Sequence, residues 1–119
     1  MTARLSLLCL AFLSACSGAT SVMCNDVAVP AIVVDPQDSA TGAALALGAS
    51  GSVQDGTFLD SLRTRSPESL QAAFEHAGTY TVTVVRVGYA DWVRSDVRVQ
   101  PGVCHVQTVT LHPLLRAVP

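Results

Sequence analysis

The chain has no lysine, and charged residues make up only 13% of its 119 residues. All seven cationic side chains are therefore arginines, and with nine Asp and Glu side chains they give a formal net charge of −2. Binding to nucleic acid phosphates needs a basic surface, so this balance argues against a nucleic acid partner. It also provides no cluster of basic residues that would attract anionic lipid headgroups.

A long hydrophobic run is also missing. The longest apolar stretch near the start, residues 5–13, is interrupted at Ser6 and falls well short of the roughly 20 residues that span a bilayer. Arg4 precedes this stretch and small residues follow it, which is the pattern of a cleaved export signal. We therefore expect residues 1–15 to be a signal peptide rather than a permanent membrane helix.

The signal segment ends in Leu13-Ser14-Ala15-Cys16, which resembles the lipobox of bacterial lipoproteins. The resemblance implies that the Cys16 thiol is diacylglycerylated, that the peptide bond before it is cut, and that the new amino group is acylated. Each buried methylene of such chains contributes ~0.8 kcal/mol, and two or three chains together anchor a protein stably. We therefore expect Cys16 to anchor the protein to the outer side of a bacterial membrane.

The residues after Cys16 bear on the cleavage site and on the choice of membrane. Cleavage after Ala19, with Ser17 and Ala19 as the small residues before the cut, is the alternative and would give an ordinary secreted protein. Ser17 is not the aspartate that resembles an inner-membrane retention signal, so we expect the outer membrane where the host has one. Small and polar residues predict a tether over 16–23, which leaves 24–119 as a single domain.

The cysteines divide between these segments. Cys9 lies in the predicted signal peptide and Cys16 in the lipobox, so Cys24 and Cys104 remain as a pair near opposite ends of the domain. Exported proteins meet an oxidising compartment, and we therefore expect these two residues to form a disulfide. Two unrelated buried thiols are the alternative, because spacing alone does not establish that the two Cα atoms approach closely enough.

Turn signals separate apolar runs rich in β-branched residues, which is typical of an all-β domain. The clearest strand has Tyr80, Val82 and Val84 on one face and threonines on the other. In the next, Val93 is expected to share a face with Val97. The strands that we expect are Ala31–Val34, Ala43–Val53, Thr57–Leu62, Thr79–Val87, a run over 93–100, and Val103–Leu111 with a bulge near Gln107.

One segment, residues 66–78, fits two structures. Ser66 and Pro67 resemble a helix start, and Gly78 a helix end. Leu70, Ala72 and Phe74 nevertheless alternate with other residues as in a strand. Local rules slightly favour a helix here.

The stretch Gly78–Val84 (GTYTVTV), followed by Gly88-Tyr89, resembles the signature of carboxypeptidase regulatory-like domains, which are similar to transthyretin. Asp35 followed by an Ala-Thr-Gly-Ala turn resembles the first hairpin of that family. The resemblance runs from about residue 32 to residue 111. It implies a seven-stranded, mostly antiparallel β-sandwich, a strand rather than a helix at 66–78, and a non-catalytic accessory, adhesive or stabilising role.

Catalytic and metal-binding motifs are missing. The sequence around Ser50 fails the G-x-S-x-G pattern of a hydrolase nucleophile at its last position. His76, His105 and His112 have no metal-ligand spacing, and Asp35 and the other loop aspartates are better explained as turn formers. We therefore expect no cofactor and no metal.

Trp92, close to Tyr89, is the remaining candidate for binding. Both aromatic residues are expected to pack on the sandwich, and the alternative is a stacking platform for a sugar or a peptide. We therefore expect a lipid-anchored, non-catalytic binding or structural module whose partner is a protein or a carbohydrate. The alternative is a small secreted enzyme or enzyme inhibitor, which would need a cleft that brings a histidine against a carboxylate and a hydroxyl.

Overall fold

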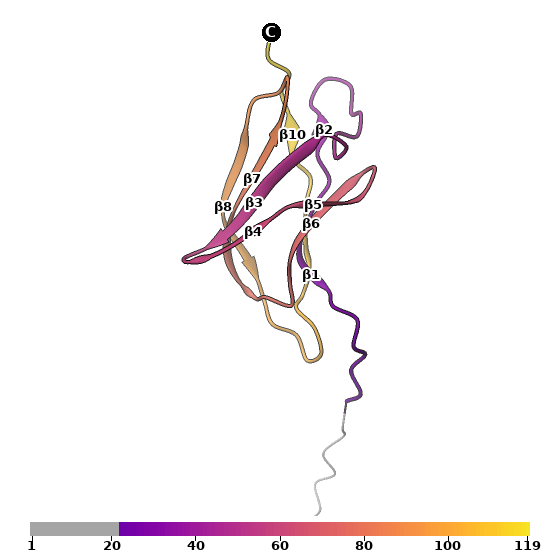
Figure 1. Ribbon diagram of the computed structural model, residues 1–119, viewed down its shortest axis with the longest axis vertical. Coiled ribbons are helices and arrows are strands. Elements are labelled where there is room, and N and C mark those ends of the chain that lie inside the picture. Colours follow the sequence, from indigo (N-terminus) through magenta and orange to yellow (C-terminus); the bar gives the residue numbers. More distant parts are fainter. Residues whose placement is uncertain (1–21) are drawn as a thin grey trace, which may run out of the picture.

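The computed structural model describes residues 22–119, in which every regular element is a strand (Figure 1). The predicted signal peptide and Cys16 lie outside the described residues. The strands are β1 (Pro30–Val34), β2 (Gln37–Asp38), β3 (Ala49–Asp55), β4 (Phe58–Ser61), β5 (Arg63–Ser66), β6 (Ser69–Phe74), β7 (Gly78–Arg86), β8 (Trp92–Val99), β9 (Val109–Leu111) and β10 (Leu114–Leu115). No helix in this range is long and apolar enough to cross a membrane.

Two four-stranded sheets pack against each other. Their strand orders are β5-β6-β1-β9 and β4-β3-β7-β8, and β10 and β2 form a third, two-stranded sheet. Most neighbours are antiparallel, whereas β1 with β9 and β2 with β10 are parallel. The expected all-β sandwich is confirmed, with ten strands of which two have only two residues.

The chain crosses between the sheets on both sides of the sandwich. On one side, β4 at the edge of one sheet leads into β5 at the edge of the other, and Leu62 between them is buried. On the other side, the C-terminal segment (residues 109–118) begins beside β1, where its Leu111 carbonyl accepts a bond from Asp35 N–H. It ends beside the β7–β8 turn, where the Arg116 carbonyl accepts a bond from Ala90 N–H.

The core lies between the inward faces of the two sheets. Tyr80, Val82 and Val84 of β7 are completely buried, as are Ile32 of β1 and Leu70 of β6. Burying a large apolar side chain contributes about 1.5–3 kcal/mol, so this cluster supplies most of the stabilisation. No polar or charged residue among those described is buried.

The Tyr80 hydroxyl is the polar end of an otherwise apolar side chain in this core. It donates a hydrogen bond to the His76 carbonyl four residues upstream, the arrangement known as a tyrosine corner in β-sandwiches. Burial raises the pKa of Tyr80 to about 12, and the nearby Asp55 and Asp60 carboxylates act in the same direction. The hydroxyl therefore keeps its proton and can donate at any physiological pH.

The two chain ends leave the domain at opposite ends (Figure 1). We call the end that carries residues 22–29, the β6–β7 turn and the loop 100–108 the lower end, as it is drawn. The upper end carries the β7–β8 turn, the loop 39–48 and the C-terminus. A tether that precedes residue 24 therefore joins the domain at its lower end.

The segment 66–78 is a β-hairpin followed by a turn, so the strand implied by the resemblance is confirmed. Ser66 Oγ accepts a hydrogen bond from Glu68 N–H at 3.3 Å, and the same chemistry would start a helix or a turn. The segment forms a strand because β6 lies between β1 and β5 and makes backbone hydrogen bonds to both. The expected alternation of Leu70, Ala72 and Phe74 with outward-facing residues ends at Ala72. Ala73 has φ +59° and is buried, and Phe74 is 40% exposed.

Strand β8 contains a bulge that the sequence did not reveal. Tyr80 pairs with Val97 and Val82 with Arg94, so β8 has one extra residue between these pairs, and Asp96 there has φ +57°. The bulge reverses the alternation. The expectation that Val93 shares a face with Val97 is therefore wrong, because Val93 is 59% exposed while Val97 is buried.

Two other expectations are wrong. The last strand does not start at Val103, because residues 100–108 form a loop. Of the expected strand, only Val109–Leu111 (β9) pairs with β1. Ala43–Val53 is a strand only from Ala49 onward, and Leu47 is 57% exposed while Leu45 is buried.

Gly51 tests how closely β3 and β7 are packed. A Cβ atom there would lie 1.9 Å from the Thr83 carbonyl oxygen and 3.0 Å from Leu62 Cδ1. Because the nearest atom belongs to the backbone, Gly51→Ala should destabilise the domain by at least about 2 kcal/mol in denaturant unfolding. The exposed neighbour Ser50→Ala should stay within about 0.5 kcal/mol of the wild type. Equal stability of Gly51→Ala and the wild type would contradict the packing described.

Candidate functional site

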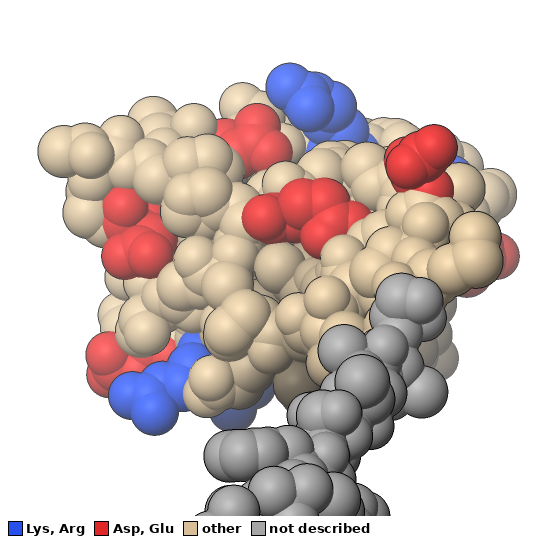
Figure 2. All heavy atoms as spheres, turned by 90° about the horizontal axis from the view of Figure 1, so that it is seen from below, with Lys and Arg blue, Asp and Glu red and all other residues tan. Residues whose placement is uncertain are grey.

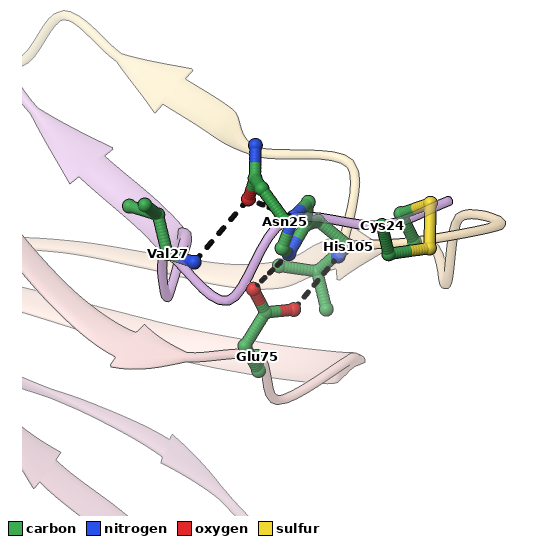
Figure 3. Close-up of a disulfide and its surroundings, with 7 residues drawn as sticks. Cys24, Asn25, Val27, Glu75 and His105 are labelled. Carbon is green, nitrogen blue, oxygen red and sulfur yellow. Dashed lines mark hydrogen bonds and ion pairs between the residues drawn. A yellow bond between two sulfur atoms is a disulfide. The ribbon is translucent and has the colours of Figure 1, made fainter. Parts of the chain in front are cut away.

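A disulfide joins Cys24 to Cys104, with the two Cα atoms 5.2 Å apart (Figure 3). The predicted pairing is therefore confirmed. Cys104 lies in the loop 100–108 and not in the last strand as expected, because β9 starts only at Val109. The bond links the N-terminal segment to the lower end of the domain across 80 residues of sequence.

Glu75 organises the polar contacts beside this disulfide (Figure 3). One carboxylate oxygen accepts hydrogen bonds from Val29 N–H, at 2.9 Å, and from His105 Nδ1, and the other accepts one from Val106 N–H at 3.3 Å. The other ring nitrogen of His105 lies 2.9 Å from Asn25 Oδ1. Residues from three separated parts of the chain therefore meet on one carboxylate.

The charge of Glu75 is favoured by these donors. Burial raises the pKa of this carboxyl, but hydrogen bonds from Val29 N–H, His105 and Val106 N–H outweigh burial and hold the pKa below its ordinary value of 4.5. A carboxylate with backbone donors on both oxygens is typically ionised. We attribute a structural role to Glu75 and His105, which were not singled out together by the sequence because their spacing matches no motif.

The lower end shows Asp and Glu at its centre and arginines only towards its margins (Figure 2). The N-terminal segment leaves the domain on this face. An acidic face is repelled by anionic lipid headgroups. The uncovered part of this face therefore shows no cluster of arginines at its centre (Figure 2).

Tyr89, one of the two aromatic candidates, ties the upper end together. Its hydroxyl donates a 2.7 Å hydrogen bond to Asp38 Oδ2, and the Arg86 guanidinium lies 5.3 Å from the centre of its ring. The hydrogen bond with Asp38 raises the pKa of Tyr89, and the same bond, with the N–H groups of Thr41 and Ala40, lowers the pKa of Asp38. Tyr89 thus fixes the loop 39–48 to the β7–β8 turn.

Trp92, the other candidate, is half-buried and packs against the core cluster. It also lines a shallow pocket of about 330 Å³ at the upper end, where the C-terminal segment passes the β7–β8 turn. The pocket combines this aromatic ring with the exposed Leu114 and two opposite charges, Asp91 and Arg116. Tyr89 does not line it, so the two candidates do not form one aromatic platform.

The three histidines lie in separate places. His76 stacks on Phe58 with ring centroids 3.7 Å apart, and His105 belongs to the Glu75 cluster. His112 is exposed, and its Nδ1 lies 3.8 Å from Asp35 Oδ2. The other carboxylate oxygen of Asp35, Oδ1, accepts a hydrogen bond from Ser69 Oγ.

The group around Asp35 contains the residue types of a hydrolase but in the wrong order. The carboxylate stands between Ser69 and His112, so the imidazole cannot take a proton from the hydroxyl that is hydrogen-bonded to Asp35. Within residues 22–119, no three His, Cys, Asp or Glu side chains come together in a way that could hold a metal ion. Of the two aromatic candidates, Trp92 is the one that lines a surface pocket.

Comparison of the chain with models of known protein families and with curated proteins finds no match. The function is therefore argued from the chain itself.

The disulfide should stabilise the domain strongly because it closes a long loop. On the chain-entropy model a loop of this length contributes about 4 kcal/mol. The Cys24→Ala/Cys104→Ala double variant should lose a similar free energy of unfolding, measured in denaturant. Non-reducing digestion of the purified protein followed by mass spectrometry should find the Cys24 and Cys104 peptides linked. Two alkylatable thiols in that protein would contradict the pairing.

The Glu75 cluster predicts a pH dependence of stability. A carboxyl whose pKa is lower in the folded state stabilises the fold above the unfolded pKa, near 4.5, and loses this contribution as pH falls through the folded pKa. Glu75→Gln should therefore be less stable than the wild type at neutral pH, and the difference should shrink between about pH 5 and pH 3. Asp91→Asn, which changes an exposed carboxylate, is the matched control. A difference independent of pH would argue against the charge of Glu75.

Proposed function

We propose that the chain is a lipid-anchored, non-catalytic binding or structural module on the extracytoplasmic side of a bacterial membrane. The anchor in this proposal is Cys16 of the lipobox, and the outer membrane is the destination in hosts that have one. The observation that carries the proposal is the Cys24–Cys104 disulfide. Disulfides persist in oxidising, extracytoplasmic compartments, so this bond supports export.

The position of the disulfide also supports a tethered domain. Cys24 follows Cys16 by eight residues, and a fully extended chain spans at most about 3.6 Å per residue. The lower end would then stay within about 30 Å of a membrane that holds Cys16. The upper end, with the pocket beside Trp92, would face away from that membrane.

The surface charge supports a lipid rather than an electrostatic attachment. Juxtamembrane proteins that bind by charge use clusters of Lys and Arg. The lower end instead has Asp and Glu at its centre (Figure 2). An acylated cysteine would supply the affinity that this face lacks, because two or three acyl chains anchor stably without any protein contact.

For the domain itself we propose the carboxypeptidase regulatory-like type. The glycines and tyrosine of the motif each have a structural task, which is consistent with this assignment. A Cβ atom at Gly78 would lie 2.2 Å from Asp55 Oδ2, Gly88 has φ +87°, and Tyr80 forms the corner bond. We assign the domain a binding or structural role, which the pocket beside Trp92 supports with an aromatic ring and two opposite charges.

Metabolic labelling with a palmitate analogue tests the anchor. The wild type should be labelled and recovered with membranes. Cys16→Ser should lose the label and its membrane attachment, because the acylated side chain is removed. Cys9→Ser is the matched control, since it removes a cysteine of the signal peptide and should leave the label intact. Equal labelling of the wild type and Cys16→Ser would end the lipoprotein proposal.

A further inference from the structure

A continuous seam runs between β8 and the C-terminal segment, where each of the two sheets has its terminal strand. The pocket beside Trp92 lies at the upper end of this seam, between residues 90–92 and residues 114–116. A second pocket of about 350 Å³ follows it, between residues 94–98 and Val109–Leu111. Because β8 and the C-terminal segment run in opposite directions, the two pockets lie one after the other along the seam.

Unpaired arginines collect along this seam. Arg116 lines the first pocket, and Arg94 and Arg98 line the second. These are three of the seven cationic side chains of a chain with net negative charge. None of the three forms an ion pair with any residue in the range 22–119. On the other side of the sandwich Arg63 pairs with Asp60, whereas Arg65 of the same strand forms no ion pair within residues 22–119.

The two pockets differ in their chemistry. The second holds Arg94 and Arg98 against one carboxylate, Asp96, and is therefore positive. In the first, Asp91 offsets Arg116, and the distinctive groups are Trp92 and Leu114, whose side chain is 60% exposed. Tryptophan and arginine are the residues that most often dominate binding energy at protein interfaces. The seam thus offers an apolar anchoring point followed by a site for carboxylates.

The seam also exposes strand edges. β8 and β9 each have a strand partner on one side only, which leaves backbone donors and acceptors available for an extended peptide. The bulge at residues 95–96 and the charged residues of β8 oppose long, uninterrupted strand addition, as at many protected edges. A short extended segment can still pair with the backbone on either side of the bulge.

We propose that this seam binds an extended, carboxylate-bearing peptide segment of a partner protein. An apolar side chain of the partner would rest against Trp92 and Leu114, and acidic side chains would pair with Arg94 and Arg98. Guanidinium groups bind carboxylates through two parallel hydrogen bonds. The open strand edges favour a peptide over an acidic polysaccharide, because a polysaccharide has no backbone that continues a sheet. The inference rests on the proposed binding role but not on the lipid anchor.

Trp92 provides the readout, since it is the only tryptophan of the chain. The probe is a short, end-blocked peptide that has leucine and two glutamates at alternate positions, with threonines between them. Titrated into the purified protein, it should change the Trp92 fluorescence saturably, and added salt should weaken the binding. A peptide with glutamines in place of the glutamates should bind at least about tenfold more weakly, because the charge-assisted hydrogen bonds are lost.

Variants locate the site. Arg94→Gln and Arg98→Gln should each weaken binding of the glutamate peptide by about tenfold. Arg65→Gln is the matched control, because it removes the same charge from an exposed position on β5 at the far side of the sandwich, and it should bind like the wild type. Circular dichroism of each variant checks that the fold is retained.

Several results would overturn the proposal. These are no fluorescence change, equal binding of the glutamate and glutamine peptides, and equal weakening by Arg65→Gln and Arg94→Gln. Tighter binding of an oligogalacturonate than of the glutamate peptide would assign the seam to acidic glycans instead. Because the titration contains no membrane, its failure is distinct from a failure of the palmitate labelling, which concerns Cys16 alone.

Discussion

The inward row of β7 is the contact on which the sandwich depends. Tyr80, Val82 and Val84 project into the space between the sheets, and all three are completely buried. In the same sheet, β3 lies so close to β7 that position 51 has no room for a Cβ atom. Burial of the row also requires the Tyr80 hydroxyl to find a partner inside the fold, because an unpaired buried hydroxyl costs about 1–3 kcal/mol. The His76 carbonyl supplies that partner.

The lower and upper ends are held by different means. At the lower end a covalent bond and the Glu75 carboxylate secure the N-terminal segment, which otherwise has almost no buried apolar residue. The C-terminal segment holds the upper end together. Its backbone pairs with β1, β2 and the β7–β8 turn, and its Leu115 side chain is buried. A strong attachment at the lower end suits a domain whose tether would pull there. The seam beside β8, between these two ends, combines two open strand edges with three arginines that form no ion pair within residues 22–119.

Charged side chains are distributed unevenly over the described surface. The face from which the N-terminal segment leaves shows Asp and Glu at its centre and arginines towards its margins (Figure 2). Along the seam, Arg94, Arg98 and Arg116 have no ion-pair partner among residues 22–119. In a protein without lysine, these arginines carry the positive charge that the proposed peptide partner would meet.

The sequence by itself determined the all-β class, the β7 strand with its buried row, and the pairing of Cys24 with Cys104. Each of these follows from a local or compositional signal: strict alternation of apolar residues, or two cysteines left over once Cys9 and Cys16 are assigned to the predicted signal peptide and lipobox. Tertiary structure alone decided the β8 bulge, the short last strand and the strand at 66–78. A bulge depends on which partner residues are opposed across a sheet, and Ser66-Pro67 begins a turn or a helix equally well until β1 and β5 provide pairing. The seam belongs to the same class, because Trp92 and Arg116 line one pocket only when the C-terminal segment lies against the start of β8.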